Sequence, residues 1–382
     1  MPVERIATRR LRAIGRRSPA TVILGARQVG KSTLARLAFP DHRVFDLEDP
    51  RHEAQLAADP LFALSQQTRT LVDEAQRLPA LFPILRSYLD ANARRRVVLL
   101  GSASPGLVRS ISESLTGRAV FFELGGISCL EEKPDRLWRL GGFPRLHWTR
   151  PRAVPQEWFP SYLRTTLERD IPQLGLALPA PRARALLTLV ANAQGSTLNL
   201  SELGGPLGVS YHTVAAALDV LEGVFLVRRL PPFVANIGKR LVKSPKVYVR
   251  DTGILHSLLG MGWTRASQLA HPKVGASWET FCIEQLVSHA ALVDPASEAF
   301  FFRTQSGVEV DLLLRLRGEL VAFEIKLGLA VKNTGPMKAA MADLGIRRGY
   351  QVNSGEDFVA LEKGLWVGGI RQVIEALGLV PK

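Results

Sequence analysis

Hydrophobic positions in the first third of the chain fall in short runs that are separated by amphipathic stretches. The runs are rich in Val, Leu and Phe, as buried parallel strands are. Helical patterns over 31–39 and 79–93 lie between them. Alternating strands and helices predict a parallel sheet with helices on both faces, because parallel strands need crossover connections. The five predicted strands are at 20–25, 43–47, 70–75, 96–102 and 119–124.

After Gly125 the pattern becomes mainly helical and then mixed. A Pro-containing stretch at 178–184 interrupts the helical patterns and predicts a linker. Toward the C-terminus a long helical pattern precedes three strand-like runs that are rich in Phe, Val and Leu. The predicted helices are at 130–140, 157–171, 183–193, 200–209, 210–223 and 278–292, and the predicted strands at 225–230, 300–304, 308–316 and 320–327.

Composition limits the class of protein. The 382 residues are 46% apolar and 22% charged, which is typical of globular domains, two or three at this length. No apolar run is long enough to span a membrane, and the first residues lack the pattern of a secretory signal. Two cysteines, Cys129 and Cys282, exclude a disulfide framework and a four-cysteine zinc site. We therefore expect a cytoplasmic protein without membrane contact.

Positive charge is concentrated in two segments. The formal net charge is +14, and residues 1–18 and 228–250 carry most of it; the second segment contains seven basic residues and no acidic one. A preference for Arg over Lys explains which basic residue is used, but not the absence of acids. Such a patch attracts phosphate polyanions and predicts DNA contact. The DNA-binding candidates here are Arg228, Arg229, Lys239, Arg240, Lys243 and Lys246.

A phosphate-binding loop follows the first predicted strand. The residues GARQVGKS match G-x-x-x-x-G-K-[ST] between a strand and a helix, as that motif requires. Main-chain N–H groups of the loop would wrap the β-phosphate of ATP, Lys31 would reach the β- and γ-phosphates, and Ser32 would ligate Mg²⁺. The predicted nucleotide-binding residues are Gly25, Ala26, Arg27, Gln28, Val29, Gly30, Lys31, Ser32 and Thr33.

Acidic residues at the end of the third predicted strand suit hydrolysis. Asp73 would hold Mg²⁺ through water, and Glu74 would polarise the attacking water as general base. Ser102, which ends the fourth strand, is either a contact of that water or γ-phosphate or a plain turn serine. Arg118 precedes the fifth strand and is either an arginine finger for a neighbouring subunit or a surface residue. A finger would require a homo-oligomer for efficient hydrolysis.

A helix-turn-helix pattern occupies 200–214. Ser210 is a plausible N-cap, which leaves Tyr211, His212 and Thr213 at the exposed start of a recognition helix. The following strand carries two arginines and resembles the wing of a winged helix. Salt-dependent binding to DNA phosphates would follow from this arrangement. The alternative is a winged helix that serves only packing or protein contacts.

Acidic residues and a lysine near the C-terminus resemble the restriction-endonuclease-like pattern D…E-x-K. Asp311 and Glu324 would bind Mg²⁺, and Lys326 would orient or activate the attacking water. Glu324 and Lys326 lie two apart on a strand and so share a face. Glu279, on the preceding helix, would complete the metal site. The centre is either an active nuclease, an inactive version that holds DNA or binds protein, or a surface-facing Glu/Lys pair.

The motifs GARQVGKSTL, TLVDEAQ, LLGSAS, SLTGRA, GGFPR and YLRTTLERDI together resemble bacterial and archaeal AAA-type ATPases, in particular a group whose C-terminal half is a domain of unknown function. The similarity runs through nearly the whole chain. It implies a helical lid and an oligomeric arrangement, with a hexamer as one form. The lid arginine that senses γ-phosphate is either Arg145 or Arg169.

The fold class expected is α/β: a P-loop sheet with a helical lid, a winged-helix module and a restriction-endonuclease-like α/β module. We expect an ATP- and Mg²⁺-dependent ATPase that binds and remodels DNA, including branched or damaged DNA. The alternative is a nucleotide-dependent switch or protein remodeller without nuclease activity. The expected domains are 1–125 for the ATPase core, 126–180 for the lid, 181–250 for the DNA-contacting module and 251–382 for the endonuclease-like module.

Overall fold

The computed structural model describes residues 5–101, 105–175, 178–234, 241–331 and 334–381. The chain divides into two compact units. The first consists of Met1–Gly126, Phe143–Arg150 and Asp219–Phe225, and the second of Ile127–Gly142, Pro151–Leu218 and Leu226–Lys382. The four domain boundaries expected from the sequence stay a prediction.

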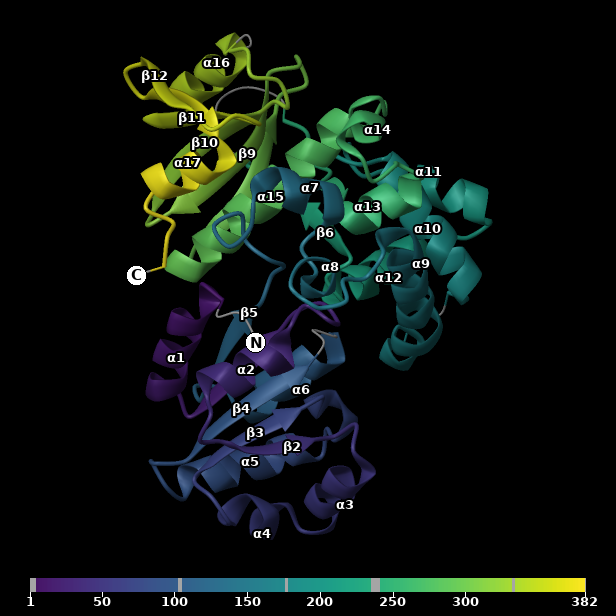
Figure 1. Ribbon diagram of the computed structural model, residues 1–382, viewed down its shortest axis with the longest axis vertical. Helices are drawn as coiled ribbons and strands as arrows, with labels where there is room; N and C mark the ends of the chain where they lie inside the picture. The colour runs from purple at the N-terminus through teal and green to yellow at the C-terminus, as the bar shows by residue number, and fades with distance from the viewer. Residues whose placement is uncertain (1–4, 102–104, 176–177, 235–240, 332–333, 382) are drawn as a thin grey trace. The chain divides into compact units, whose positions relative to one another are not determined.

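A five-stranded parallel sheet forms the centre of the first unit, in the order β2-β3-β4-β1-β5 (Figure 1). β4 lies between β1 and β3, so the strand before the phosphate loop and the strand that ends in Asp73 are both its neighbours. All five strands predicted from the hydrophobic runs are confirmed. They are β1 (Ala20–Leu24), β2 (Arg43–Asp46), β3 (Arg69–Asp73), β4 (Arg96–Gly101) and β5 (Ala119–Glu123).

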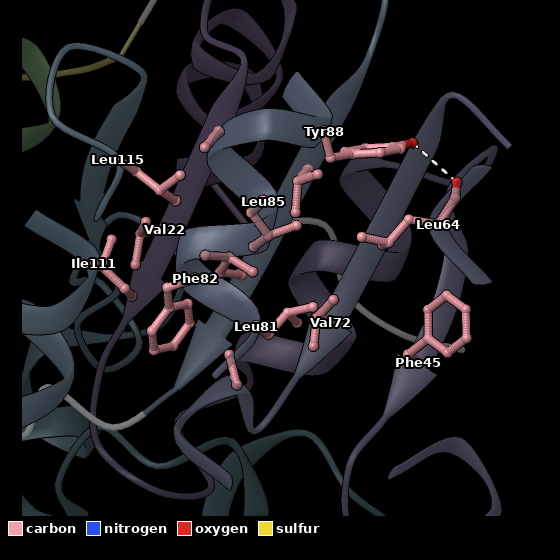
Figure 2. Packing of buried hydrophobic residues seen from close by; sticks show 14 of the residues in the cluster. Val22, Phe45, Leu64, Val72, Leu81, Phe82, Leu85, Tyr88, Ile111 and Leu115 are labelled. Atoms are coloured by element: carbon pink, nitrogen blue, oxygen red, sulfur yellow. Dashed lines mark hydrogen bonds between the residues drawn. The ribbon is translucent and has the colours of Figure 1, made fainter. Parts of the chain in front are cut away.

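Several helices of the first unit share an apolar core with this sheet. Figure 2 shows Phe82 and Leu85 packed with Val22 and Val72 of the sheet, and Tyr88, whose hydroxyl donates to the carbonyl oxygen of Leu64 at 3.0 Å. The helices are α1 (Ala7–Arg17), α2 (Lys31–Ala38), α3 (Pro50–Ala58), α4 (Pro60–Ser65), a 3-10 turn (Ala75–Arg77), α5 (Leu81–Asp90), α6 (Pro105–Ser114) and α8 (Pro144–His147).

Local sequence explains where several helices begin. Asp49 and Asp59 each precede a proline, and their carboxylates accept from the main-chain N–H groups of Arg51 and Phe62. An aspartate N-cap followed by proline is a strong start signal, because proline has no N–H to leave unsatisfied. α3 and α4 are therefore separated by a single capping residue.

The N-terminal part of the second unit is mostly helical and includes one short hairpin. β6 pairs antiparallel with β7, and Thr197 forms a further antiparallel bridge to Lys246. Residues of α12 through Leu218 belong to this unit. The elements are α7 (Pro134–Leu140), α9 (Pro155–Thr165), a π-helix (Thr166–Asp170), a 3-10 turn (Pro172–Leu174), α10 (Ala180–Asn192), α11 (Leu200–Gly204), a 3-10 turn (Gly205–Leu207), α12 (Tyr211–Gly223), β6 (Val227–Leu230), β7 (Lys246–Val249), α13 (Thr252–Leu259) and α14 (Arg265–Leu269).

A six-stranded mixed sheet follows, in the order β12-β13-β11-β10-β9-β8 (Figure 1). β8, β9 and β10 form an antiparallel meander, and β11 runs parallel to β10. The long helix and three strands predicted here are confirmed. The elements are α15 (Val274–Val293), β8 (Glu298–Arg303), β9 (Glu309–Leu316), β10 (Glu319–Ile325), α16 (Gly335–Leu344), β11 (Arg348–Asn353), β12 (Phe358–Glu362), β13 (Leu365–Gly369) and α17 (Ile370–Ala376).

Within the described ranges, no helix has the length and apolar character needed to cross a membrane.

Candidate functional site

The phosphate loop connects the buried strand β1 to the start of α2. Gly25 packs so closely that a Cβ there would lie 2.5 Å from the carbonyl oxygen of Leu124. Gly30 has φ +102°, and Gln28 has φ +60°, so the loop turns through left-handed backbone twice. Glycine at Gly30 avoids the steric cost that other residues have in this region. The sequence thus fits a tight loop between the end of β1 and the start of α2.

The side chain of Lys31 is buried and bonds to the main chain of the phosphate loop. It is 8% exposed, and its Nζ donates to the carbonyl oxygens of Gly25 at 2.9 Å and Ala26 at 3.0 Å. Burial lowers the pKa of Lys31, while the carboxylates of Glu74 and Asp73 act in the opposite direction. The ammonium is therefore placed between the loop and the acidic end of β3.

The acidic pair at the end of β3 is held in a defined geometry. Asp73 is buried, and its Oδ1 accepts from the main-chain N–H of Glu74 at 3.0 Å. Glu74 has φ +54°, and its carboxylate accepts from the side-chain amide of Gln76. Burial raises the pKa of Glu74, and Lys31 opposes that shift. A raised pKa makes a carboxylate a better proton acceptor near neutral pH, as a general base needs.

A cavity of about 820 Å³ opens beside the phosphate loop within the first unit. Arg5 borders it, with its guanidinium carbon 5.7 Å from the ring centre of Trp148 and its Nη2 donating to the carbonyl oxygen of Gly126 at 2.6 Å. The exposed Arg145 of α8 lines the same cavity. Its other lining residues are Gly30, Thr33, Leu34, Leu37, Pro144, Thr149 and Arg150.

These placements distinguish the two candidate lid arginines. Arg145 shares both the unit and the cavity with the phosphate loop. Arg169 lies in the π-helix of the second unit and is exposed. The structure therefore brings Arg145, and not Arg169, to the loop within one unit. A γ-phosphate sensing role for Arg145 stays a prediction.

Arg118 and Ser102 have different outcomes. Arg118 pairs with Asp90 at the end of α5, with its Nε 2.6 Å from Oδ1 and its Nη2 2.8 Å from Oδ2. The pair is partly exposed, so a finger role would require Arg118 to leave Asp90. Ser102 lies outside the described residues.

The residues present fit a magnesium nucleotide. The glycine loop leaves main-chain N–H groups at a helix N-terminus, and a buried ammonium stands ready for phosphate oxygens. Ser32 and Asp73 would hold Mg²⁺. When Mg²⁺ is bound together with ATP, it neutralises part of the negative charge of the phosphates. The remaining loop residues, Arg27, Val29 and Thr33, would line the phosphates; Arg27 also pairs with Glu48 at 3.4 Å.

A second cluster of charged side chains lies on two interior strands of the C-terminal sheet, β9 and β10. Lys326 Nζ is 2.6 Å from Glu324 Oε1 and 3.6 Å from Asp311 Oδ2. Asp311 Oδ2 also accepts from the main-chain N–H of Ile325 at 2.7 Å, across the β9–β10 pairing. The structure thus brings together three of the four residues of the predicted D…E-x-K centre.

Glu279 joins this cluster with two partners that sequence reasoning did not assign to it. Its Oε1 accepts from the Tyr248 hydroxyl at 2.6 Å and lies 3.4 Å from Lys246 Nζ. Lys246 Nζ is also 2.6 Å from Glu309 Oε1. Glu309 and Asp311 lie two residues apart on β9 and so share a face of the sheet. This spacing was the feature of the sequence from which the place of Glu309 in the cluster could have been predicted. We call these seven residues the carboxylate–lysine centre: Lys246, Tyr248, Glu279, Glu309, Asp311, Glu324 and Lys326.

The acidic side chains of this centre lie close together and change one another's pKa. Burial, followed by the charge of Asp311, raises the pKa of both Glu279 and Glu324 to about 7. Burial alone would lower the pKa of Lys246, but Glu279, Asp311 and Glu309 together raise it above its ordinary value. In the part of the chain that the structure describes, no group of three or more His, Cys, Asp or Glu is placed to hold a metal ion. A Mg²⁺ role for Asp311, Glu324 and Glu279 stays a prediction.

Fewer basic side chains of the segment 228–250 are available to bind DNA than its composition indicated. Arg228 and Arg250 both pair with Glu284, with side chains 18%, 11% and 14% exposed. Lys246 is 2% exposed and committed to carboxylates. The predicted DNA contacts of Lys246 and Arg228 are corrected accordingly, because a paired cation that is buried, as Lys246 is, or largely buried, as Arg228 is, offers little surface to a phosphate. Lys243 is exposed and Arg229 half-buried, whereas Lys239 and Arg240 lie outside the described residues.

The start of α12 lies as predicted. Ser210 caps the helix by accepting from the main-chain N–H of Thr213 at 3.2 Å. Tyr211 is 52% exposed, and its ring centre lies 3.9 Å from that of the exposed His212. These two rings form an exposed aromatic pair at a helix N-terminus. DNA contact by Tyr211, His212 and Thr213 stays a prediction.

Comparison with known proteins identifies the family. A model of the AAA domain matches residues 17–132, and models of two domains of unknown function, DUF8612 and DUF4143, match 131–265 and 274–373. "Uncharacterized protein Mb2031c" of Mycobacterium bovis and "Uncharacterized protein Rv2008c" of Mycobacterium tuberculosis are each 41% identical over 359 residues, which cover 92% of this chain and 80% of theirs. The chain belongs to the family of these mycobacterial proteins.

This family member is an ATPase, because it combines the AAA domain with the phosphate loop and its acidic strand end. The resemblance to AAA-type ATPases with a C-terminal domain of unknown function is thereby confirmed. Two solved structures are more distantly similar. The Walker-type ATPase PABY2304 of Pyrococcus abyssi is 14% identical, with a TM-score of 0.44 over 66% of this chain and 94% of its own. The STAND protein PH0952 of Pyrococcus horikoshii is 13% identical, with a TM-score of 0.24 over 77% and 51%.

Proposed function

We propose that this ATPase binds and remodels DNA, with branched or damaged DNA as its substrate class, and that it acts as a homo-oligomer. The single observation that carries the DNA assignment is the contact of Lys326 with both Asp311 and Glu324. Asp311 and Glu324 stand on the adjacent strands β9 and β10, and Lys326 directly follows β10. From α15 to β11 the chain forms a helix, three strands, a helix and a strand. That order resembles restriction-endonuclease-like modules, which contact the DNA backbone.

The helical part of the second unit supports the same proposal. α10, α11 and α12 are followed by the β6–β7 hairpin, and residues 195–198 run along β7 through hydrogen bonds such as Leu198 N–H to the Pro245 carbonyl oxygen at 2.7 Å. Three helices followed by a small sheet are the elements expected of a winged helix, which supports the proposal. Its recognition position would be the start of α12, where Tyr211 and His212 are exposed.

Hydrolysis would draw on residues of the first unit. Lys31 would neutralise phosphate charge and Glu74 would act as general base, with Arg145 as the sensor of γ-phosphate. Arg118 would enter the site of a neighbouring copy after leaving Asp90, which is the reason to propose an oligomer. Asp90 is half exposed, so little free energy opposes that exchange.

DNA binding is tested by fluorescence anisotropy with a labelled duplex and a labelled four-way junction at two salt concentrations. We expect affinity to fall steeply with salt, since binding releases counterions. Lys243→Ala should reduce the slope of log K against log salt by about one, as loss of one phosphate contact does. Lys363→Ala, at another exposed lysine of the second unit, is the matched control. Unchanged slope and affinity in Lys243→Ala would remove this segment from the interface.

Two other functions give different results. A nucleotide-dependent switch or protein remodeller would bind neither the duplex nor the four-way junction with measurable affinity. An active Mg²⁺-dependent nuclease would cut the DNA, and Lys326→Ala would end cleavage while leaving ATP turnover intact. A wild-type preparation that never cleaves, at DNA concentrations where it is fully bound, removes the nuclease alternative.

A further inference from the structure

The position of the Lys246 side chain bears on whether the C-terminal module cuts DNA or only holds it. A metal ion bound by both Glu279 and Asp311 would have to lie in the space between the carboxylates of the carboxylate–lysine centre. Lys246 reaches this space from β7, outside the α15–β11 module. Its side chain is 3% exposed, so the ammonium lies inside the centre rather than at its rim.

Close contacts fix the ammonium there. Nζ lies 2.6 Å from Glu309 Oε1 and 3.4 Å from Glu279 Oε1, and it is 5.5 Å from the ring centre of Phe301. Glu309 is itself held through its second oxygen, which is 3.4 Å from Arg303 Nε. Aromatic and carboxylate neighbours both favour a cation at this point.

The backbone of Lys246 is fixed as firmly as its side chain. Lys246 is the first residue of β7, pairs with Leu230 of β6 and forms a bridge to Thr197. The ammonium is therefore tethered by the small sheet of the winged-helix-like part. Any movement of that hairpin away from β9 would withdraw the charge.

The other carboxylates are occupied as well. Lys326 neutralises Glu324, and Asp311 receives the main-chain N–H of Ile325. Glu279 receives the hydroxyl of Tyr248. The residues as placed do not fit a divalent metal, because each carboxylate already has a cation or a donor and the central space contains a positive charge.

We propose that Lys246 is a built-in cation that stands in for a metal ion in the carboxylate–lysine centre, so that this module holds DNA without cutting it while Lys246 is in place. The part about DNA rests on the proposed function; the cation substitution does not. The substitution has a direct consequence: removal of the ammonium leaves an acidic cavity that should take up a divalent cation.

The test is Mn²⁺ binding to the full chain without nucleotide or DNA, followed by the electron paramagnetic resonance signal of free Mn²⁺. The wild type should show no site that depends on Asp311. Lys246→Met keeps most of the side-chain length but removes the ammonium. This variant should bind one Mn²⁺ at least about tenfold more tightly than any residual binding by the wild type, because a facing positive charge has been removed. Lys246→Met combined with Asp311→Asn should lose the gain. Lys363→Met, at an exposed lysine outside the centre, is the matched control and should bind Mn²⁺ as the wild type does.

Two results would overturn the proposal. One is a wild-type Mn²⁺ site that disappears in Asp311→Asn, which would show that metal and Lys246 coexist. The other is a folded Lys246→Met protein, by circular dichroism, with no gain in Mn²⁺ affinity. Should Lys246→Met fail to fold, the wild-type comparison with Asp311→Asn still decides, because a site present there contradicts the proposal and its absence supports it. Neither readout needs DNA, so failure of the proposed function is seen separately, as absence of DNA binding.

Discussion

The Nζ atom of Lys31 lies 2.9 Å from the carbonyl oxygen of Gly25, six residues earlier in the same phosphate loop. The ammonium therefore satisfies the loop's own carbonyls and is held at the point where β1 ends. A phosphate oxygen that enters the loop would compete for this ammonium, and because Lys31 is buried the exchange occurs in a poorly solvated place where charge interactions are strong.

Lys31→Ala should abolish ATP turnover, because the charge that stabilises the transferred phosphoryl group is lost. Removing one such electrostatic group costs on the order of 10²–10³ in kcat. The measurement is phosphate release at saturating ATP. Lys133→Ala, at an exposed lysine remote in sequence from the loop, is the control and should keep its activity. Turnover retained in Lys31→Ala would place the nucleotide site elsewhere.

Gly25→Ala should disrupt the phosphate loop. The new Cβ would lie 2.5 Å from the carbonyl oxygen of Leu124, a main-chain atom that cannot rotate away. We expect loss of ATP binding in a titration with a fluorescent ATP analogue, together with a lower unfolding temperature. Gly106→Ala is the matched control, since a Cβ there meets nothing within 4 Å and alanine favours the helix α6. Normal ATP affinity in Gly25→Ala would contradict the loop geometry.

Arg118→Ala should leave ATP binding near normal and slow hydrolysis, on the order of 10³-fold if Arg118 is a finger. Asp90→Ala separates this role from the ion pair of Arg118 within its own chain, because it breaks the pair but leaves the arginine. A finger predicts that Asp90→Ala hydrolyses ATP at least as fast as the wild type. Equal slowing in both variants, or loss of ATP binding in Arg118→Ala, would show that the arginine acts within its own chain.

Glu284→Gln should destabilise the second unit by about 3–5 kcal/mol at pH 7, because two largely buried arginines lose their shared partner. Burial alone would raise the pKa of Glu284, but Arg228 and Arg250 lower it to about 2. A carboxyl group with a lowered pKa in the folded state contributes stability that is complete above its ordinary pKa of 4.5 and is lost as pH falls toward 2.

The difference in unfolding free energy between wild type and Glu284→Gln should therefore be largest at pH 7 and shrink between pH 4.5 and pH 3, as measured by urea titration. Glu298→Gln is the control, because Glu298 is exposed and such surface pairs contribute at most about 1 kcal/mol. A difference independent of pH would mean that Glu284 is not ionised in the folded protein.

Much of the fold could be predicted from the sequence where local pattern decides it. The strands beginning at Ala20, Arg43, Arg69, Arg96 and Ala119 are short apolar runs between helices, and Ser210 lies at a helix start that it caps. The phosphate loop could be predicted because glycine, lysine and serine at fixed spacing leave few other structures open. In these cases the chemistry and the geometry come from neighbouring residues.

Sequence reasoning failed where distant residues meet. Lys246 and Arg228 were assigned to DNA because the segment around them contains no acid, yet their partners Glu309 and Glu284 come from β9 and α15. Charge along the sequence does not show which cations are neutralised by long-range pairing. The choice between Arg145 and Arg169 was open for the same reason, since only the folded chain shows which arginine lines the cavity beside the loop.

ATP turnover with and without DNA at two salt concentrations tests the central claim most directly. The account predicts that duplex or junction DNA stimulates phosphate release by the wild type, that the stimulation weakens as salt rises, and that Lys31→Ala shows none. Wild-type turnover that is the same with and without DNA at both salt concentrations would contradict the claim that this ATPase acts on DNA.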